Sequence, residues 1–260
     1  MKTSPIVLLT DFGVADPYVG QVKGVLLSRC PGVVLIDLSH NVPPGAVLTA
    51  AFLLKSSLSC FPSGTVFMAV VDPGVGSARR ALALEAGGLR FVGPDNGLLP
   101  ATLEGFAPIR RARSIENPRF RRSPLSSTFH GRDLFAPAAA ALANGAALSR
   151  LGPPAPNLVP GRIPSPRKAG KGWIGEVLWV DRFGNLITNL PAGLAAKNST
   201  LRVGKRMLRG TRDHFAQMPS GRPLALGGSF GTLELSVNRG RADRFFRAEI
   251  GSPVQIQNPS

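Results

Sequence analysis

The sequence predicts an α/β fold in its first part and an all-β fold in its second part. Uninterrupted apolar runs, which are typical of buried parallel strands, alternate in the first part with segments of helical periodicity. In the second part, short strand-like runs are separated by turn residues, and no long helical pattern occurs. Between the two parts lies a stretch rich in Pro, Gly and Lys without periodicity, which is typical of a linker.

The first domain is predicted to span residues 1–160 and to alternate strands with helices. Strands are expected at 5–10, 33–38 and 65–71, with a hairpin of 81–86 and 90–94 across Gly87 and Gly88. Helices are expected at 17–28, 45–58 and 131–145, the last of which ends at Gly145. This order predicts a Rossmann-like α/β domain with a mainly parallel sheet that helices cover on both faces.

The second domain is predicted to span residues 173–260, after a linker at 161–172. Its strands are expected within 172–181, 185–190, 200–208, 223–228, 232–238 and 252–257. Short strands with turn residues between them predict a small all-β barrel or sandwich, and of these we expect a β-barrel domain.

The amino-acid composition predicts a folded protein without membrane helices or a disulfide framework. A hydrophobic content of 43% predicts a folded chain, and no apolar run approaches the ~20 residues of a membrane helix. Residues 1–13 carry a short apolar run and Asp11, so we expect a first strand there rather than a signal peptide. The two cysteines, Cys30 and Cys60, suggest no disulfide framework, which favours reduced, mostly buried thiols and a cytoplasmic location.

The formal net charge is +16 at pH 7, from 31 basic and 15 acidic residues. A basic balance of this size can indicate a nucleic-acid partner. However, the basic residues are spread along the chain, with short runs at 109–113, 119–122 and 239–247, and no aromatic motif is interleaved with them. We therefore interpret them as solvated surface, and we keep a nucleic-acid binder only as an alternative.

Acidic or amide side chains follow the ends of four predicted strands. They are Asp11, Asp37 with His40 close behind, Asp72, and Asp95 with Asn96. In open parallel sheets the ligand crevice lies outside the carboxyl ends of the strands, so we expect several of these groups to converge on one pocket. A single Asp before Gly or Pro is most often a turn residue, but the repetition predicts a polar site.

The loop at residues 72–80, DPGVGSARR, joins a strand-end carboxylate to two adjacent arginines. It has neither the Gly-Lys-Ser/Thr of a P-loop nor the G-x-G-x-x-G pattern, so it does not predict a phosphate cradle. Asp11, Asp72 and His130 could instead bind a metal ion, as in a metal-dependent nucleotide phosphohydrolase. We keep this enzyme as an alternative, although no pair of ligands has a characteristic spacing. His130 directly precedes a predicted helix, whose N-terminus lowers the pKa of a histidine.

Seven motifs occur in an order that resembles a known family. They are TDFG…DPYVG from residue 10, DLSH from 37, VDPGVGS from 71, PDNGLL from 94, STFHGRD from 127, DRFGNLITN from 181 and LELSVNRG from 233. Each motif is weak alone, but together they cover nearly the whole chain. The sequence resembles the S-adenosyl-L-methionine hydroxide adenosyltransferases, or SAM hydrolases, which are relatives of the fluorinase and chlorinase enzymes.

The resemblance implies an enzyme that hydrolyses S-adenosyl-L-methionine to adenosine and L-methionine by attack of activated water on the ribose 5′ carbon. It implies no cofactor, no metal and no membrane, and a catalytic triad of Asp72, Arg79 and His130. The guanidinium and the imidazole can hold a water molecule and stabilise its hydroxide character, while the carboxylate orients them. A non-catalytic binder of adenosyl ligands is kept as an alternative.

The resemblance also implies substrate-binding residues and a homotrimer with sites between subunits. Asp11 is expected to hold the ribose hydroxyls with Asp16 close by, Phe183 and Asn185 to meet the adenosine, Asp181 and Ser229 the methionine end, and Asn238 the adenine. The halide-using relatives have Tyr-Pro-x-Thr in place of residues 72–75 and Tyr-Ser in place of His130 and Gly131. This chain therefore resembles the water-using members.

Overall fold

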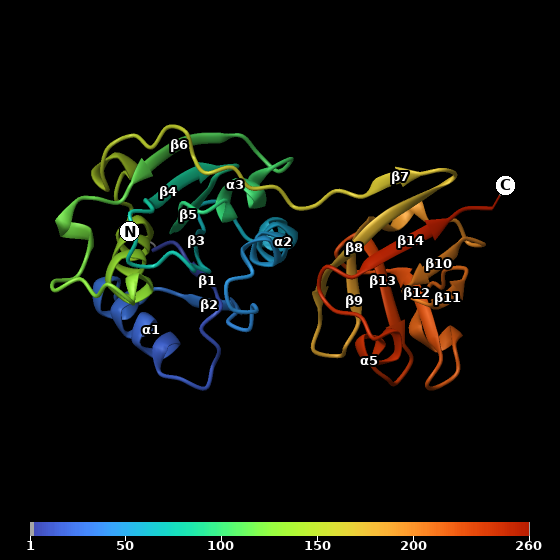
Figure 1. Ribbon diagram of the computed structural model, residues 1–260. Helices are drawn as coiled ribbons and strands as arrows, with labels where there is room; N and C mark the ends of the chain where they lie inside the picture. Colours follow the sequence, from blue (N-terminus) through green and yellow to red (C-terminus); the bar gives the residue numbers. More distant parts are fainter. Residues whose placement is uncertain (1–2, 260) are drawn as a thin grey trace. The chain divides into compact units, whose positions relative to one another are not determined.

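The computed structural model describes residues 3–259, in a chain that divides into two compact units, residues 1–163 and 164–260 (Figure 1). The first unit packs helices on a six-stranded sheet, and the second unit forms an eight-stranded antiparallel sheet. The predicted α/β class is confirmed in this broad form.

The sheet of the first unit has the strand order β2-β1-β3-β5-β4-β6. Its strands are β1 (Ile6–Thr10), β2 (Leu35–Ser39), β3 (Val66–Val70), β4 (Ala81–Ala86), β5 (Leu89–Pro94) and β6 (Ile109–Ser114). The pairs among β2, β1, β3 and β5 are parallel, whereas β4 pairs antiparallel with β5 and β6. The sheet is therefore mixed, because Gly87 and Gly88 adopt positive φ and reverse the chain between β4 and β5.

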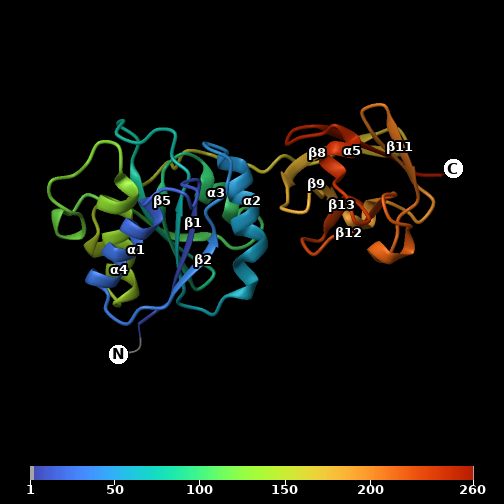
Figure 2. The same ribbon diagram turned by 90° about the horizontal axis from the view of Figure 1, so that it is seen from below.

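Helices cover both faces of this sheet (Figure 2). On one face lie α1 (Tyr18–Arg29) and α4 (Ala136–Ala143), and on the other lie α2 (Val47–Ser57) and α3 (Leu98–Leu103). Successive strand residues point to opposite faces, so Ile6 packs with α1 and α4 whereas Val7 packs with α2. Each face of the sheet thus buries its own apolar core.

The predicted helix at 131–145 begins with a wider turn. Residues Gly131–Phe135 form a π-helical turn, and α4 follows directly. A Cβ on Gly131 would lie 2.8 Å from the Phe12 ring, so a larger residue at this position would displace that ring. Such π-helical turns are frequent at functional sites.

The sequence pattern predicts neither α3 nor β6. α3 spans only 6 residues, too few for a helical period to stand out. In β6, Arg110, Arg111 and Arg113 interrupt the apolar run that would indicate a strand.

The second unit is a curved antiparallel sheet with the strand order β11-β10-β14-β8-β9-β13-β12, and β7 pairs with β8 off this path. Its strands are β7 (Arg167–Ala169), β8 (Gly172–Val180), β9 (Leu186–Pro191), β10 (Thr200–Val203), β11 (Arg206–Arg209), β12 (Pro223–Gly227), β13 (Thr232–Val237) and β14 (Pro253–Gln257). The sheet wraps around one core that includes Val177, Leu201 and Leu235, which makes it nearly barrel-shaped.

Two features of the second unit differ from the expected pattern. β7 lies inside the stretch 161–172 that the sequence predicts to be a linker, where Gly170, at a φ of +56°, turns the chain into β8. A short helix, α5 (Ala242–Phe246), lies within the basic run 239–247 and buries two of its side chains in the core. A helix of 5 residues shows too little periodicity to be predicted.

Both cysteines are free thiols. Cys30 is buried and donates a hydrogen bond to Asn144 Oδ1 (3.0 Å), and burial raises the pKa of its thiol. Cys60 ends a short 3-10 turn and is exposed, in contrast to the burial expected of it.

Phe67 offers a test of the packing around β3. Its ring is fully buried, stacks on Phe91 at a centroid distance of 5.4 Å and meets Phe61 edge-on at 5.2 Å. Removing the ring leaves a cavity, so we expect Phe67→Ala to lower the free energy of unfolding by about 3–5 kcal/mol. Urea unfolding followed by circular dichroism at 222 nm measures the change. Leu27→Ala, at an exposed site, is the control, and an equally small loss in both variants would contradict this packing.

Candidate active site

The loop that follows β3 folds a strand-end carboxylate against an arginine. Beyond Val70 the chain turns back, and Ser77 N and Oγ both donate to Gly74 O (3.1 and 2.7 Å). As a result, Arg79 Nε donates to both carboxylate oxygens of Asp72 at 3.0 Å, and Arg79 Nη2 donates to Asp72 Oδ2. The pair is buried, since only 5% of the Asp72 side chain and 10% of the Arg79 side chain are exposed.

His130 joins this pair from a distant part of the chain. Nη2 of Arg79 donates to Nδ1 of His130 at 2.8 Å. Because a guanidinium only donates, Nδ1 is the acceptor, and the neutral imidazole carries its proton on Nε2. Burial lowers the pKa of His130 and the charge of Arg79 lowers it further, against the opposing effects of Asp72 and Asp133. His130 is therefore neutral at pH 7, with Nε2–H available as a donor.

Gly76 allows the two loops to meet. It adopts a φ of +79°, and a Cβ at this position would overlap the carbonyl oxygen of Ser127, in the segment that leads to His130. Only glycine permits this close approach. Gly76 thus serves the contact between two loops rather than the binding of a phosphate.

A second ion-pair network holds the segment that carries His130. Asp133 is buried and accepts hydrogen bonds from Arg132 Nε (2.7 Å), Arg122 Nη1 (3.2 Å) and the backbone N of Ser126 (3.0 Å). The hydrogen bond from Arg132, above all, lowers the pKa of Asp133, against the effect of burial. The ionised carboxylate ties together residues 122 to 133 and so fixes the position of the imidazole.

Aromatic side chains surround the cluster, and the sequence analysis assigns them no role. Phe12, Tyr18 and Phe129 contact one another edge-to-face, with ring centroids between 5.3 and 6.4 Å apart. Phe135 lies under the Arg79 guanidinium at 5.2 Å. The available signal is motif membership, because Phe12 lies in TDFG and Phe129 lies in STFHGRD.

Two of the strand-end carboxylates are engaged elsewhere. Arg80 Nε donates to Asp95 Oδ2 (2.7 Å), whose other oxygen accepts a backbone N–H at 2.9 Å. Asp37 pairs with Lys23 (2.6 Å) and with His40 Nε2 (3.0 Å). Asp37 and Asp95 therefore stabilise the fold, and they do not join the cluster at Asp72.

Asp11 lies at the end of β1, next to the Asp72 loop. Its Oδ2 accepts a hydrogen bond from Gly45 N at 2.9 Å. A Cβ on Gly45 would in turn lie 3.8 Å from the Cβ of Pro73, so the two loops are in contact through this glycine. Asp16 is exposed in the segment between β1 and α1. The structure thus brings Asp11 close to the cluster and leaves Asp16 on the surface.

The second unit contains a cavity of about 660 Å³ that gathers several of the predicted binding residues. Its lining includes Asp181, Phe183, Asn185, Glu234 and Asn238. The sequence analysis assigns a binding role to each of these residues except Glu234. Ser229 is not among the lining residues and is exposed in the loop between β12 and β13.

The turn DRFGN between β8 and β9 forms one wall of this cavity. Asp181 accepts hydrogen bonds from Asn185 N (2.8 Å) and Nδ2 (2.9 Å), and Gly184 adopts a φ of +84°. Phe183 stands at the tip of the turn with 73% of the residue exposed. An aromatic ring held out by a rigid turn is suited to stack on a planar ligand.

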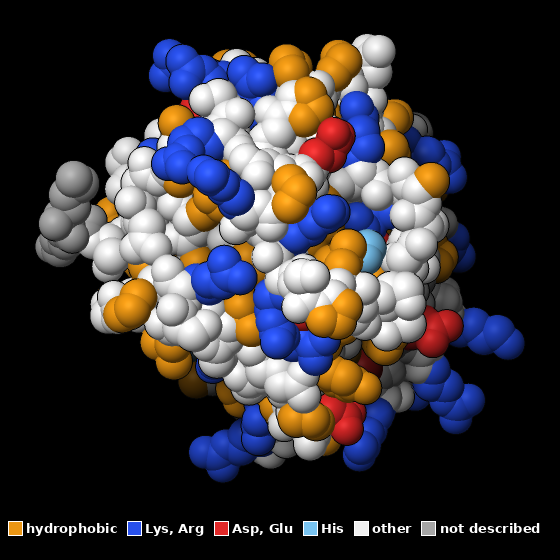
Figure 3. Space-filling view, turned by 90° about the vertical axis from the view of Figure 1, so that its left-hand side faces the viewer, with side chains coloured by type: hydrophobic (Ala, Val, Ile, Leu, Met, Phe, Trp, Pro, Cys, Tyr) orange, Lys and Arg blue, Asp and Glu red, His pale blue; other side chains and the backbone are white. Residues whose placement is uncertain are grey.

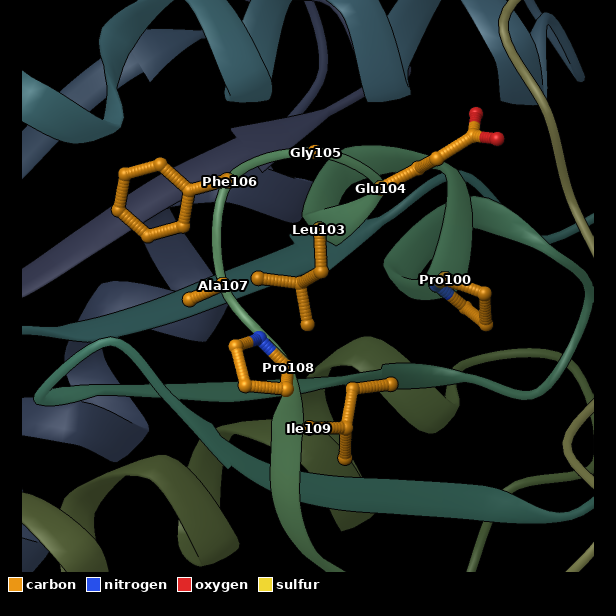
Figure 4. Close-up of a pocket in the computed structure, with 8 residues that line it drawn as sticks. All are labelled: Pro100, Leu103, Glu104, Gly105, Phe106, Ala107, Pro108 and Ile109. Carbon is orange, nitrogen blue, oxygen red and sulfur yellow. The ribbon is translucent and has the colours of Figure 1, made fainter.

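A hollow of about 430 Å³ lies in the first unit beside α3 and β6 (Figure 4). Its lining is mostly apolar and includes Leu103, Phe106 and Ile109. Glu104, the one ionisable residue of this lining, turns away from the other side chains and pairs with Arg162 at 3.2 Å. The hollow therefore presents no group suited to catalysis.

Charged side chains are unevenly distributed. On the face shown in Figure 3, Lys and Arg side chains form several separate groups with uncharged surface between them, and acidic side chains are few.

Within residues 3–259, no three His, Cys, Asp or Glu side chains lie close enough together to share a metal ion.

A sheet covered on both faces, with a buried carboxylate and guanidinium and a half-buried imidazole beyond its strand ends, is typical of an enzyme that acts on small molecules. Family comparisons are more specific. The SAM hydroxide adenosyltransferase N-terminal domain matches residues 6–152, and the C-terminal domain of the same family matches residues 175–255. The chain therefore belongs to the SAM hydroxide adenosyltransferase family.

Relatives match nearly the whole chain. A protein from Thermus thermophilus named (R)-S-adenosyl-L-methionine hydrolase is 45% identical, over 97% of this chain and 99% of its own length. A protein of the same name from Salinispora tropica is 42% identical, over 95% of both chains. A fluorinase from an Actinoplanes species is 31% identical, over 71% of both chains.

Solved structures share the fold. A crystal structure of a conserved protein from Thermotoga maritima matches with a TM-score of 0.91 and 35% identity, over 97% of this chain and all of that one. A structure from Thermus thermophilus matches with a TM-score of 0.79 and 42% identity, over 97% of this chain and 99% of that one.

Among residues 3–259, no helix has the length and apolarity needed to cross a membrane.

The contact with Arg79 predicts how His130 titrates. We expect the imidazole to titrate below 6.5, and Arg79→Gln to raise its pKa, because the substitution removes a positive charge and leaves Asp72 unpaired. NMR titration of the imidazole Cε1–H, with the resonance assigned from a His130→Ala variant, measures both values. A pKa at or above 6.5 in the unaltered protein, or no rise in Arg79→Gln, would contradict the contact.

Proposed function

We propose that this protein hydrolyses S-adenosyl-L-methionine to adenosine and L-methionine, with Asp72, Arg79 and His130 as its catalytic residues. The observation that carries the proposal is the partly buried contact of these side chains, which lie 7 and 51 positions apart in the sequence. Family membership supports the choice of substrate, because relatives that match nearly the whole chain are named for this hydrolysis.

The reaction is a displacement at the 5′ carbon of the ribose. The oxygen of a water molecule forms a bond to C5′ while the C5′–S bond breaks. The electron pair of that bond goes to sulfur, which leaves as the neutral thioether of methionine, and the attacking water releases one proton to the solvent. Because the sulfonium leaves without being protonated, the task of the site is to hold and activate the water.

The three residues contribute in different ways. Arg79 and the Nε2–H of His130 donate hydrogen bonds that hold the water oxygen and stabilise the negative charge it develops. Asp72, the only anion of the three, keeps the guanidinium in place and balances its charge. Positioned groups of this kind contribute about 10²–10⁴-fold in rate. In-line placement of the water against the bound sulfonium adds to this effect.

Acidic side chains suit the cationic substrate. S-adenosyl-L-methionine carries a sulfonium, an ammonium and a carboxylate, and a protein of formal charge +16 repels it at long range, so local carboxylates are needed. We assign the remaining binding roles as the family motifs imply: Asp11 with Asp16 at the ribose, Phe183 and Asn185 at the adenosine, Asp181 and Ser229 at the methionine end, and Asn238 at the adenine.

The (R) epimer at sulfur is the proposed substrate. The relatives from Thermus thermophilus and Salinispora tropica carry names that specify (R)-S-adenosyl-L-methionine. In an in-line displacement the sulfur lies opposite the water, and the two epimers place the methyl group differently around that axis. A site that packs against the methyl group therefore distinguishes them.

The two units are proposed to act as the domains expected from the sequence: a Rossmann-like domain at 1–160, a linker at 161–172 and a β-barrel at 173–260. The catalytic cluster belongs to the first unit, whereas the cavity with Phe183 belongs to the second. A homotrimer, in which the first domain of one subunit meets the barrel of a neighbour, would unite them. The exposed Phe183 ring suits such an interface, and the free thiols agree with a cytoplasmic location.

Substitution of the triad tests the proposed reaction. We expect His130→Ala and Asp72→Asn to lower kcat for adenosine formation by at least about 10²-fold, because each removes a group that holds or orients the water. Metal-free protein is incubated with each sulfonium epimer and a chelator, and adenosine and methionine are measured by liquid chromatography. Unaltered protein should form equal amounts of both products from the (R) epimer.

Glu116→Gln is the matched control for these variants, since Glu116 is an exposed acid of the first unit. It should keep full activity, and circular dichroism checks that every variant is folded. Full activity in both triad variants would remove the catalytic assignment. No adenosine from folded, unaltered protein would remove the hydrolase assignment itself.

Mixed oligomers test the proposed trimer. His130→Ala and Asn185→Ala, each impaired alone, are expected to form mixed trimers with about a third of full activity, because one of the three sites of any trimer that contains both variants pairs an intact first domain with an intact barrel. The two variants carry different tags, mixed oligomers are isolated through both tags, and the same assay is applied. Activity no higher than that of the separate variants would place each site within one subunit.

A further inference from the structure

A hollow of about 350 Å³ in the first unit collects arginines from three distant parts of the chain. Arg29 is the last residue of α1, whereas Arg119 and Arg150 lie in two short 3-10 turns. All three are exposed and line the hollow. Arg119 belongs to the basic run 119–122, to which the proposed reaction assigns no role. The fold, rather than the local sequence, brings these three side chains together.

The three arginines have no carboxylate partner. No Asp or Glu lines the hollow, and within residues 3–259 none forms an ion pair with Arg29, Arg119 or Arg150. Glu116, which is exposed and precedes Arg119 closely in the sequence, is not part of the lining. Positive charges around one hollow repel one another unless an anion lies between them.

Contacts orient two of the three guanidinium groups. Nη2 of Arg29 donates a long hydrogen bond to the carbonyl oxygen of Arg121 (3.5 Å). The guanidinium of Arg150 lies over the Phe120 ring, 5.8 Å from its centroid, and this ring packs against the apolar core of the same face. Because a guanidinium has five N–H groups, both arginines keep donors for a ligand.

A neighbouring hollow shows how paired arginines differ from these. Arg29 also lines this second hollow, of about 400 Å³, together with Arg122 and Arg132. Both of those arginines donate to Asp133 (3.2 and 2.7 Å), so their charge is partly balanced within the chain. The unbalanced positive charge therefore lies in the first hollow.

Helix ends do not account for the three arginines. The negative end of the α1 dipole favours a cation at Arg29, but Arg119 and Arg150 lie outside the α-helices. Asn144 and Gly145, directly after α4, also line the hollow. Each helix end contributes only about half a negative charge, which three guanidinium groups outweigh. The hollow therefore attracts anions.

The hollow is separate from the candidate active site. Its lining includes no residue of the triad. The last residues of α4 contact the amino ends of the strands, since Ala143 O accepts from Ser4 N (3.1 Å), before β1, and Leu142 O accepts from Arg90 Nη1 (2.8 Å), in β5. The triad lies beyond the carboxyl end of β3. A ligand in the hollow would therefore leave the place of the reacting water free.

We propose that this hollow binds a di- or triphosphate group, either as a free anion or as the phosphate chain of a nucleotide. A guanidinium donates parallel hydrogen bonds to phosphate oxygens, and three of them suit a ligand with several negative charges. A volume of about 350 Å³ is at the lower end of the range of small-molecule sites and suffices for a short phosphate chain. The inference does not depend on the proposed reaction.

Isothermal titration calorimetry with tripolyphosphate tests the site. We expect unaltered protein to bind this anion with a Kd of about 100 μM or tighter at low salt, and less tightly as salt is added. Arg29→Gln, Arg119→Gln and Arg150→Gln should each weaken binding about tenfold, because each removes charge-assisted hydrogen bonds. The triple variant should show no binding. A weaker Kd of the unaltered protein, or no change in the variants, would overturn the inference.

Two control variants show where the anion binds. Arg110→Gln removes an exposed arginine of the same unit that does not line the hollow, and Arg79→Gln removes the guanidinium of the candidate active site. Both should keep the affinity of unaltered protein, and circular dichroism checks that every variant is folded. Equal weakening in Arg110→Gln would mean that net charge alone attracts the anion. Weakening confined to Arg79→Gln would place the anion in the active site, and either result would overturn the inference.

Two further ligands identify the source of the phosphates. ATP without magnesium should bind at least as tightly as tripolyphosphate. Equal affinities would show that the phosphate chain alone is recognised, and tighter binding of ATP would show that the hollow accepts a nucleotide. A single-stranded oligonucleotide is the third ligand of the series. If it binds while tripolyphosphate and ATP do not, the arginines form a nucleic-acid surface and the inference is wrong.

Discussion

The buried ion pair between Arg79 and Asp72 is the interaction on which the candidate site depends. Arg79 holds both oxygens of the carboxylate, and the same guanidinium reaches Nδ1 of His130. Without Asp72, the Arg79 guanidinium would be a buried unpaired charge. Without the guanidinium, the imidazole of His130 would lose its fixed tautomer. The rest of the first unit serves this pair: β3 ends where the carboxylate is needed, and Gly76 lets the returning loop touch the segment before His130.

Much of the fold could be predicted because local patterns determine it. The apolar strands around Ile6 and Val66 are buried on both faces, as uninterrupted apolar runs indicate, and the hairpin at Gly87 turns where its glycines predict. Short or charged elements were not predicted. The helix α3 is too short to show helical periodicity, and arginines interrupt the apolar pattern of β6. The strand at Arg167–Ala169 falls in a stretch whose composition resembles a linker, and pairing with β8 overrides that composition.

The candidate site shows where local sequence is insufficient. Asp37 and Asp95 share the strand-end pattern of Asp72, yet each is neutralised by a basic side chain that only the tertiary structure brings to it. Motif resemblance singled out the triad, but nothing local places His130 against a residue 51 positions away. Glu234 alternates with leucines as a solvent-facing strand residue would, yet it is buried in the lining of the cavity.

The arginines of β6 have a consequence for how separate molecules behave. β6 is the last strand of its sheet; residues 153–155 cover its outer edge at Ala112 and Ser114, and the edge around Arg110 has no neighbouring strand among the described residues. Arg110 and Arg111 are exposed along this border. A second molecule that added its own β6 here would bring like charges together, and their repulsion opposes strand addition and aggregation. Part of the large positive charge of this protein then protects its solubility, a role that requires no ligand at all.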